Sequence, residues 1–116
     1  FATVFVGECN NAAVAVKSFQ QIQKREIRRE IAVMAMLAKM EHPHICHLLG
    51  LTNSTPTKLV LELCLGGTLY AALHYPGPRG PLDWCQRFVV VNQVASALRH
   101  IHHHNVMHRD LKSNNV

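Results

Sequence analysis

Hydrophobic residues dominate two short runs at the start of the chain. Residues 1–7 are rich in β-branched and aromatic side chains, which predicts a strand, and residues 12–19 are expected to form a second one. Asn10 and Asn11 lie between the runs, and asparagine tolerates the left-handed backbone of tight turns. The pattern therefore predicts an antiparallel hairpin.

The hydrophobic period changes over residues 24–40. Apolar residues there recur at steps of four, three and four, which places them on one face of a helix: Ile27, Ile31, Met34 and Ala38. Pro43 is expected to end this helix. Residues 45–51 and 58–63 then predict two further strands, joined by a turn-forming segment.

The rest of the chain has a helical pattern. Gly66–Gly67 breaks the chain, residues 68–74 predict a short helix, and the proline-rich residues 75–81 predict a loop. The order of elements indicates a two-part α+β arrangement. We place its junction at residues 62–67.

The strongest predicted helix follows the loop. Asp83 can cap its first turn, and Gln86 three residues later completes a capping-box pattern. Its apolar stripe is expected to consist of Trp84, Phe88, Val91, Ala95 and Leu98. So broad an apolar surface requires packing partners.

Charge narrows the possible functions only slightly. Twelve Lys and Arg residues against seven Asp and Glu give a formal net charge of +5 and a pI near 9.3. Much of the positive charge lies in residues 24–30, interleaved with acids, which is typical of the solvated face of a helix. A basic nucleic-acid-binding helical protein is one alternative, and the charge is its only support. We expect no nucleic-acid partner.

Cysteine usage and hydropathy bear on the location. The four cysteines include no C-x-x-C pair, which favours reduced thiols in an intracellular, cytoplasmic setting. The longest apolar run, residues 31–38, is far too short to span a membrane, so we expect no membrane segment. No signal-peptide pattern is visible, and Phe1 is not an initiator, so we expect the chain to begin within a domain.

A polar octet, residues 108–115, reads His-Arg-Asp-Leu-Lys-Ser-Asn-Asn and follows the long helix. Asp110 can accept a hydroxyl proton and orient a nucleophile. Lys112 can neutralise charge on a transferred phosphoryl group, and the Asn115 carbonyl can ligate magnesium. These residue types at this spacing suit phosphoryl transfer better than they suit an ordinary polar loop.

The octet resembles H-R-D-L-K-x-x-N, the catalytic-loop signature of eukaryotic protein kinases. The resemblance implies that Asp110 is the catalytic base and Asn115 a Mg²⁺ ligand. It also implies that Lys112 contacts phosphate, as in serine/threonine kinases. Together with the Leu48-Leu49-Gly50 segment, the amino-acid sequence of this loop is most similar to that of the tyrosine-kinase-like group of serine/threonine kinases.

A second motif, Val14-Ala15-Val16-Lys17, lies on the second predicted strand. Alternation places Ala15 and Lys17 on one face, so a flat base could approach the small residue while the ammonium reaches phosphates. The motif resembles the kinase V-A-I-K segment. By this resemblance Lys17 holds the α- and β-phosphates of ATP.

That lysine requires a carboxylate from the following helix. Glu30, thirteen residues downstream, is the first candidate, and Glu26 is the fallback. His42 lies twelve residues after Glu30, three more than the kinase pattern leads us to expect, which adds nearly one helical turn. Alternatively, Glu30 is a solvated partner of Arg25 or Lys24.

Residues 59–69 run from a strand into the Gly-Gly break and resemble the kinase hinge, which recognises adenine edge-on. The resemblance implies that Leu61 is the gatekeeper. It implies that the Glu62 carbonyl and the Cys64 amide bond adenine. Thr68 would lie near the ribose.

The opening residues 1–4 resemble the end of the glycine-rich loop, G-x-G-x-x-G-x-V. Val4, together with Ala15, would then cover the adenine base. The first two glycines of the pattern would precede residue 1, and Ala2 stands at the third. We therefore assign none of the phosphate-binding amides of the glycine-rich loop to this chain.

The resemblance covers essentially the whole chain and implies an incomplete kinase domain of α+β class. A small antiparallel sheet lobe with one helix is expected over residues 1–61, a hinge over 62–68, and the start of a helical large lobe over 69–116.

The expected function is that of an ATP-dependent protein serine/threonine kinase, with ATP and Mg²⁺ as cofactors and a protein Ser/Thr hydroxyl as acceptor. No Asp-Phe-Gly segment is present, so the 116 residues alone are expected to be inactive and poorly folded. A catalytically silent kinase-like binding module is the second alternative. Lys17, Asp110 and Asn115 argue against it, since silent members usually lose one of them.

Overall fold

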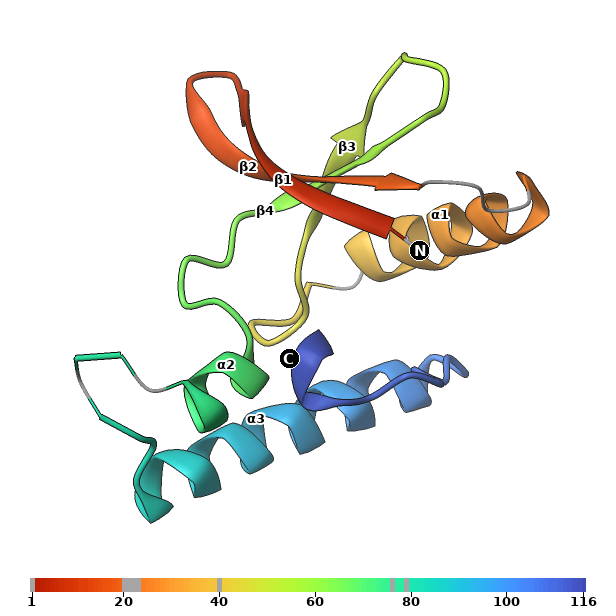
Figure 1. The fold of residues 1–116 in the computed structure, drawn as a ribbon. Helices are drawn as coiled ribbons and strands as arrows, with labels where there is room; N and C mark the ends of the chain where they lie inside the picture. The colour runs from red at the N-terminus through yellow and green to blue at the C-terminus, as the bar shows by residue number, and fades with distance from the viewer. Residues whose placement is uncertain (1, 20–23, 40, 76, 79) are drawn as a thin grey trace. The chain divides into compact units, whose positions relative to one another are not determined.

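Two compact units, Phe1–Cys64 and Leu65–Val116, make up the chain (Figure 1). The structure is a computed structural model that describes residues 2–19, 24–39, 41–75, 77–78 and 80–116. Among these residues, no helix combines the length and the apolar character needed to cross a bilayer.

The first unit is built on a four-stranded antiparallel sheet. Its strands, in the spatial order β1-β2-β4-β3, are β1 (Ala2–Cys9), β2 (Ala12–Phe19), β3 (Leu48–Leu51) and β4 (Leu59–Glu62). Helix α1 (Lys24–Ala38) follows β2 and lies along one side of the sheet (Figure 1). The predicted small antiparallel sheet with one helix is therefore confirmed.

The β1–β2 hairpin forms where the two asparagines predict it. Asn10 and Asn11 both have positive φ, 50° and 62°, as a two-residue type I′ turn requires. Gly7 lies on β1 against β2, and a Cβ atom on it would come within 2.9 Å of Val16 Cγ2. Glycine therefore allows the close packing of these two strands.

The core of the first unit is centred on β2, an inner strand. Val14, Ala15 and Val16 are consecutive and all buried, so both faces of β2 are covered at this point. Phe19 and the fully buried Leu59 of β4 complete this core. The strand that carries Lys17 is thus the most firmly packed part of the sheet.

Strand β3 is shorter than its hydrophobic run. We expected a strand from residue 45, but residues 43–45 form a turn in which the Ile45 amide donates to the His42 carbonyl at 3.1 Å. The strand begins only at Leu48. Hydropathy does not detect such a backbone turn, because the residues in it are themselves partly apolar.

The second unit contains α2 (Leu69–His74), α3 (Trp84–His103) and the short 3-10 helix η1 (Ser113–Asn115). The amide of Leu69 donates to the Val116 carbonyl at 2.7 Å, which joins the start of α2 to the end of the chain. The buried hydrophobic residues described in this unit are Ile101 and Val106.

Most of the predicted apolar stripe of α3 is exposed, and of its five residues only Leu98 is partly buried. Trp84, Phe88 and Val91 are 81%, 70% and 63% exposed. The less exposed side instead follows Val90, Val94, Ala97 and Ile101. This stripe is displaced by one residue, about 100° around the helix. Because apolar residues occupy both faces of α3, their period alone does not determine which face is covered.

The start of α3 follows its predicted cap. Asp83 Oδ1 accepts the Gln86 amide at 2.7 Å, and Gln86 Oε1 accepts the Asp83 amide at 2.9 Å. This reciprocal pair satisfies two of the amides that a helix leaves open at its first turn.

We therefore expect Asp83→Ala to destabilise the first turn of α3 by about 1 kcal/mol, and Asp83→Asn to preserve it, because asparagine caps as well as aspartate. Amide hydrogen exchange at Gln86 measures this directly, with an expected acceleration of about fivefold in the alanine variant alone. Equal exchange in all three proteins would contradict the cap.

Candidate functional site

Lys17 lies on β2 and forms an ion pair with Glu30 of α1. Its Nζ atom is 2.5 Å from Glu30 Oε1, and the two side chains are 29% and 37% exposed. The ammonium also lies 5.6 Å from the centre of the Phe19 ring. The pair holds the amine of a strand lysine at a fixed place over the sheet.

The Lys17–Glu30 ion pair indicates where the three extra residues between Glu30 and His42 lie. Glu30 contacts Lys17 despite the excess, so the added residues come after Glu30 and do not rotate it away from the sheet. Among the described side chains, Glu30 pairs with Lys17 and not with Arg25, and the Lys24 side chain lies outside the described residues. The fallback, the Glu26 side chain, lies outside the described residues.

The strand register brings four of the predicted nucleotide-binding residues to one face of the sheet. Val4 pairs with Lys17, and Ala15 pairs with Leu61. Directly paired residues of antiparallel strands share a face, as do residues two apart on one strand. A flat ligand on this face would therefore meet small and apolar side chains next to one amine.

The end of β4 presents the expected hinge residues of the first unit. The amide of Glu62 donates to the His47 carbonyl at 3.0 Å, which fixes the backbone beside β3. The Glu62 carbonyl, which we expect to contact adenine, lies 3.8 Å from Cys46 Sγ, at the distance of a weak thiol hydrogen bond. Cys64 follows two residues later with an exposed side chain.

Cys46 is the residue of this region that sequence reasoning missed. Its thiol lies near Glu62 and Cys64, and burial, together with these two neighbours, raises the pKa of Cys46 to about 12. The four cysteines show no paired spacing, so only the register of β3 against β4 could have revealed this neighbourhood.

Thr68 belongs to the second unit and caps α2. Its Oγ1 atom accepts the Ala71 amide at 3.1 Å. This hydrogen bond explains why α2 begins after the Gly-Gly break. The ribose contact expected of Thr68 stays a prediction.

In the polar octet, two side chains contact the carboxylate of Asp110. Lys112 Nζ lies 2.9 Å from Asp110 Oδ1, and Asn115 Nδ2 donates to Asp110 Oδ2 and to its backbone carbonyl, both at 2.8 Å. Arg109 has a left-handed φ of 63°, uncommon for a non-glycine residue, where the backbone turns before Asp110. The loop thus places an acid, a cation and an amide within direct contact.

These contacts determine the ionisation of Asp110. Hydrogen bonds from Lys112 and Asn115 lower the pKa of this exposed carboxyl below its ordinary value. Asp110 is therefore a carboxylate at neutral pH, which is the form that accepts a proton. Because the Asn115 amide nitrogen faces Asp110, the amide oxygen is the end that could face a cation.

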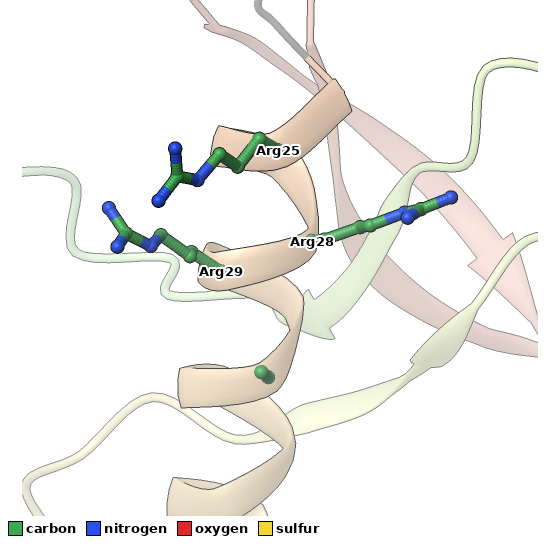
Figure 2. Close-up of a pocket in the computed structure, with 4 residues that line it drawn as sticks. Arg25, Arg28 and Arg29 are labelled. Atoms are coloured by element: carbon green, nitrogen blue, oxygen red, sulfur yellow. The ribbon is translucent and has the colours of Figure 1, made fainter.

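An open hollow on α1 is lined by Arg25, Arg28, Arg29 and Ala32, and it contains none of the predicted site residues (Figure 2). Arg25 and Arg29 extend toward the same side, whereas Arg28 points away from them (Figure 2). The three guanidinium groups do not converge on one point. The hollow is therefore a solvated helix face, as the charge pattern predicts, rather than a built anion site.

Comparisons with known proteins identify the family to which the chain belongs. Residues 1–116 match the family model described as protein tyrosine and serine/threonine kinase. The chain is 34% identical over 122 residues to the probable L-type lectin-domain containing receptor kinase V.3 of Arabidopsis thaliana, an alignment that covers 100% of the chain and 18% of that protein. The chain belongs to the protein kinase family.

Further relatives include kinases of both specificities. Serine/threonine-protein kinase CTR1 of Arabidopsis thaliana is 34% identical over 124 residues, covering 100% of the chain and 15% of that protein. Non-receptor tyrosine-protein kinase TNK1 of Mus musculus is 36% identical over 88 residues, covering 76% of the chain and 13% of that protein. The chain spans less than a fifth of the length of these relatives.

The contacts of Asp110 predict how its titration responds to substitution. Lys112→Met and Asn115→Ala should each raise the pKa of Asp110 toward its ordinary value of 3.8, with the larger rise in Lys112→Met, because the lysine hydrogen bond is the largest cause of the lowering. Carboxyl-carbon NMR titration measures the pKa. Lys39→Met, which removes an exposed lysine of the first unit, serves as the control. An unchanged Asp110 titration in both loop variants would refute these contacts.

Proposed function

We propose that the protein transfers the γ-phosphoryl group of ATP to a serine or threonine hydroxyl of a protein substrate. The observation that carries this proposal is the convergence of Lys112 and Asn115 on the Asp110 carboxylate. An ionised carboxylate with an adjacent amine and an amide oxygen is the set of groups that in-line phosphoryl transfer uses.

In this proposal Asp110 orients the acceptor hydroxyl and takes its proton. The hydroxyl oxygen bonds to the γ-phosphorus while the bond to the β–γ bridging oxygen breaks, and ADP leaves. Lys112 turns from Asp110 toward the transferred group and offsets its charge. The amide oxygen of Asn115 and carboxylate oxygens suit the hard Mg²⁺ ion, which would neutralise phosphate charge when bound.

Nucleotide binding is assigned to the sheet face and to the end of β4. Lys17, positioned by Glu30, binds the α- and β-phosphates, and Val4 and Ala15 cover the base. The strand pairing supports the assignment, because it places Val4 opposite Lys17 and Ala15 on the same face of the sheet. Leu61, as the gatekeeper, limits how deeply the adenine base can enter its site.

The remaining contacts to the nucleotide come from the segment after β4. The Glu62 carbonyl and the Cys64 amide bond the adenine edge, and Thr68 lies near the ribose. Glu62 is the last residue of β4, and Cys64 and Thr68 follow the strand, which places these polar groups next to one another along the chain.

The acceptor specificity and the setting are also proposed. Lys112, two residues after Asp110, supports serine/threonine specificity, and we place the activity in the cytoplasm. The 116 residues by themselves are proposed to be inactive, because the magnesium-binding aspartate of an Asp-Phe-Gly segment is not among them.

The test is a phosphorylation assay on the intact protein with labelled ATP and a peptide library that contains Ser, Thr and Tyr acceptors. Asp110→Asn should lower kcat by about 10²- to 10⁴-fold, because an amide cannot take the hydroxyl proton. Asp83→Asn is the matched control and should retain the wild-type rate, since Asp83 only caps α3.

Three results would contradict the proposal. Transfer to tyrosine alone would refute the acceptor specificity, and equal rates for wild type and Asp110→Asn would refute the role of Asp110. ATP binding without any transfer would favour a catalytically silent binding module.

A further inference from the structure

Two thiols and a carboxylate meet beside the β3–β4 pair. One ligand atom each from Cys46, Glu62 and Cys64 lies within 4.8 Å of the other two. Within the part of the chain that the structure describes, these residues form the one group of three or more potential metal ligands so close together. All three belong to the first unit.

The sheet backbone holds these groups in place. Cys46 lies two residues before β3, and Glu62 ends the antiparallel partner strand β4. The hydrogen bond from the Glu62 amide to the His47 carbonyl, 3.0 Å long, continues the pairing beyond the strand. Cys46 and Glu62 therefore lie beside strand ends that are already paired, which reduces the ordering that a bound ion would require, and Cys64 follows two residues after β4.

The spacing suits a small tetrahedral ion. Zn²⁺ binds thiolate sulfur at about 2.3 Å and carboxylate oxygen at about 2.0–2.2 Å, so two sulfurs on one zinc are roughly 3.8 Å apart. Side-chain rotation would bring the three atoms from within 4.8 Å of one another to such distances. A fourth position would stay open to water.

The chemistry of the donors selects the type of ion. Two thiolates favour soft or borderline metals over Mg²⁺ and Ca²⁺, which prefer oxygen ligands. Among the described residues, Glu62 has no ion-pair partner, so none of their side-chain cations competes for its carboxylate. Cys46 and Cys64 are both exposed residues that solvent can reach, although the Cys46 thiol is itself partly buried.

We propose that Cys46, Glu62 and Cys64 form a Zn²⁺-binding site at the end of the β3–β4 pair. Binding displaces one proton from each thiol, so two thiolates and one carboxylate coordinate the ion. The proposal does not depend on the phosphoryl-transfer activity, since the ion is held by the side chains of Glu62 and Cys64, whereas adenine binding is assigned to their backbone carbonyl and amide.

The test is a titration of the intact, reduced protein with Zn²⁺ in the presence of a chromophoric chelator, repeated with Co²⁺ as a spectroscopic probe. The expected result is equimolar binding and a thiolate-to-Co²⁺ charge-transfer band. Cys46→Ser and Cys64→Ser should each weaken Zn²⁺ binding by at least about tenfold, and Glu62→Gln by less.

Cys9→Ser and Cys85→Ser are the matched controls, because both remove an exposed free thiol that is not a member of the cluster. Their Zn²⁺ affinity should equal that of the wild type. If Cys9→Ser or Cys85→Ser weakens binding as much as Cys46→Ser does, the assigned site is wrong.

A second measurement needs no variant and so does not depend on variant folding. Zn²⁺ should slow the alkylation of Cys46 and Cys64 in the wild-type protein and leave the rates at Cys9 and Cys85 unchanged, as read by mass spectrometry. Absence of Zn²⁺ binding, or equal protection of all four thiols, would overturn the proposal.

Discussion

The ion pair between Lys17 and Glu30 joins an inner strand of the sheet to helix α1. Both side chains are about one-third exposed, so the pair contributes little to stability, on the order of 0–1 kcal/mol. Its importance is positional. The buried neighbours of Lys17 on β2 fix the strand, and the carboxylate then fixes the ammonium at one place on the face shared by Val4 and Ala15.

In the second unit, close partners likewise hold a charged group in place, here the carboxylate of Asp110. Asp110 has neither burial nor a hydrophobic setting to hold it, and local hydrogen bonds from Lys112 and Asn115 position it instead. The left-handed Arg109 and the bond from Leu69 to Val116 fix the backbone around this cluster. In both units a rigid backbone comes first, and the charged groups are then oriented by one or two close partners.

Local chemistry was predictable from the sequence, whereas long-range packing was only partly so. The Asn10-Asn11 turn and the Asp83 cap follow from preferences of single residues, and both form as expected. The covered side of α3 coincides with the predicted stripe only at Leu98, because apolar residues lie on both sides of the helix. The neighbourhood of Cys46 was missed for another reason: it arises from the register of β3 and β4, which residue spacing along the chain does not encode.

A double-mutant cycle on the affinity for Mg²⁺-ATP tests the central claim most directly, that Glu30 acts on nucleotide binding by positioning Lys17. Affinity is measured for the intact wild-type protein, Lys17→Met, Glu30→Gln and the double variant. The account predicts that each single variant weakens binding and that the double variant is no weaker than Lys17→Met, with a coupling of about 0.5–3 kcal/mol. Additive losses, or unchanged affinity in Lys17→Met, would contradict it.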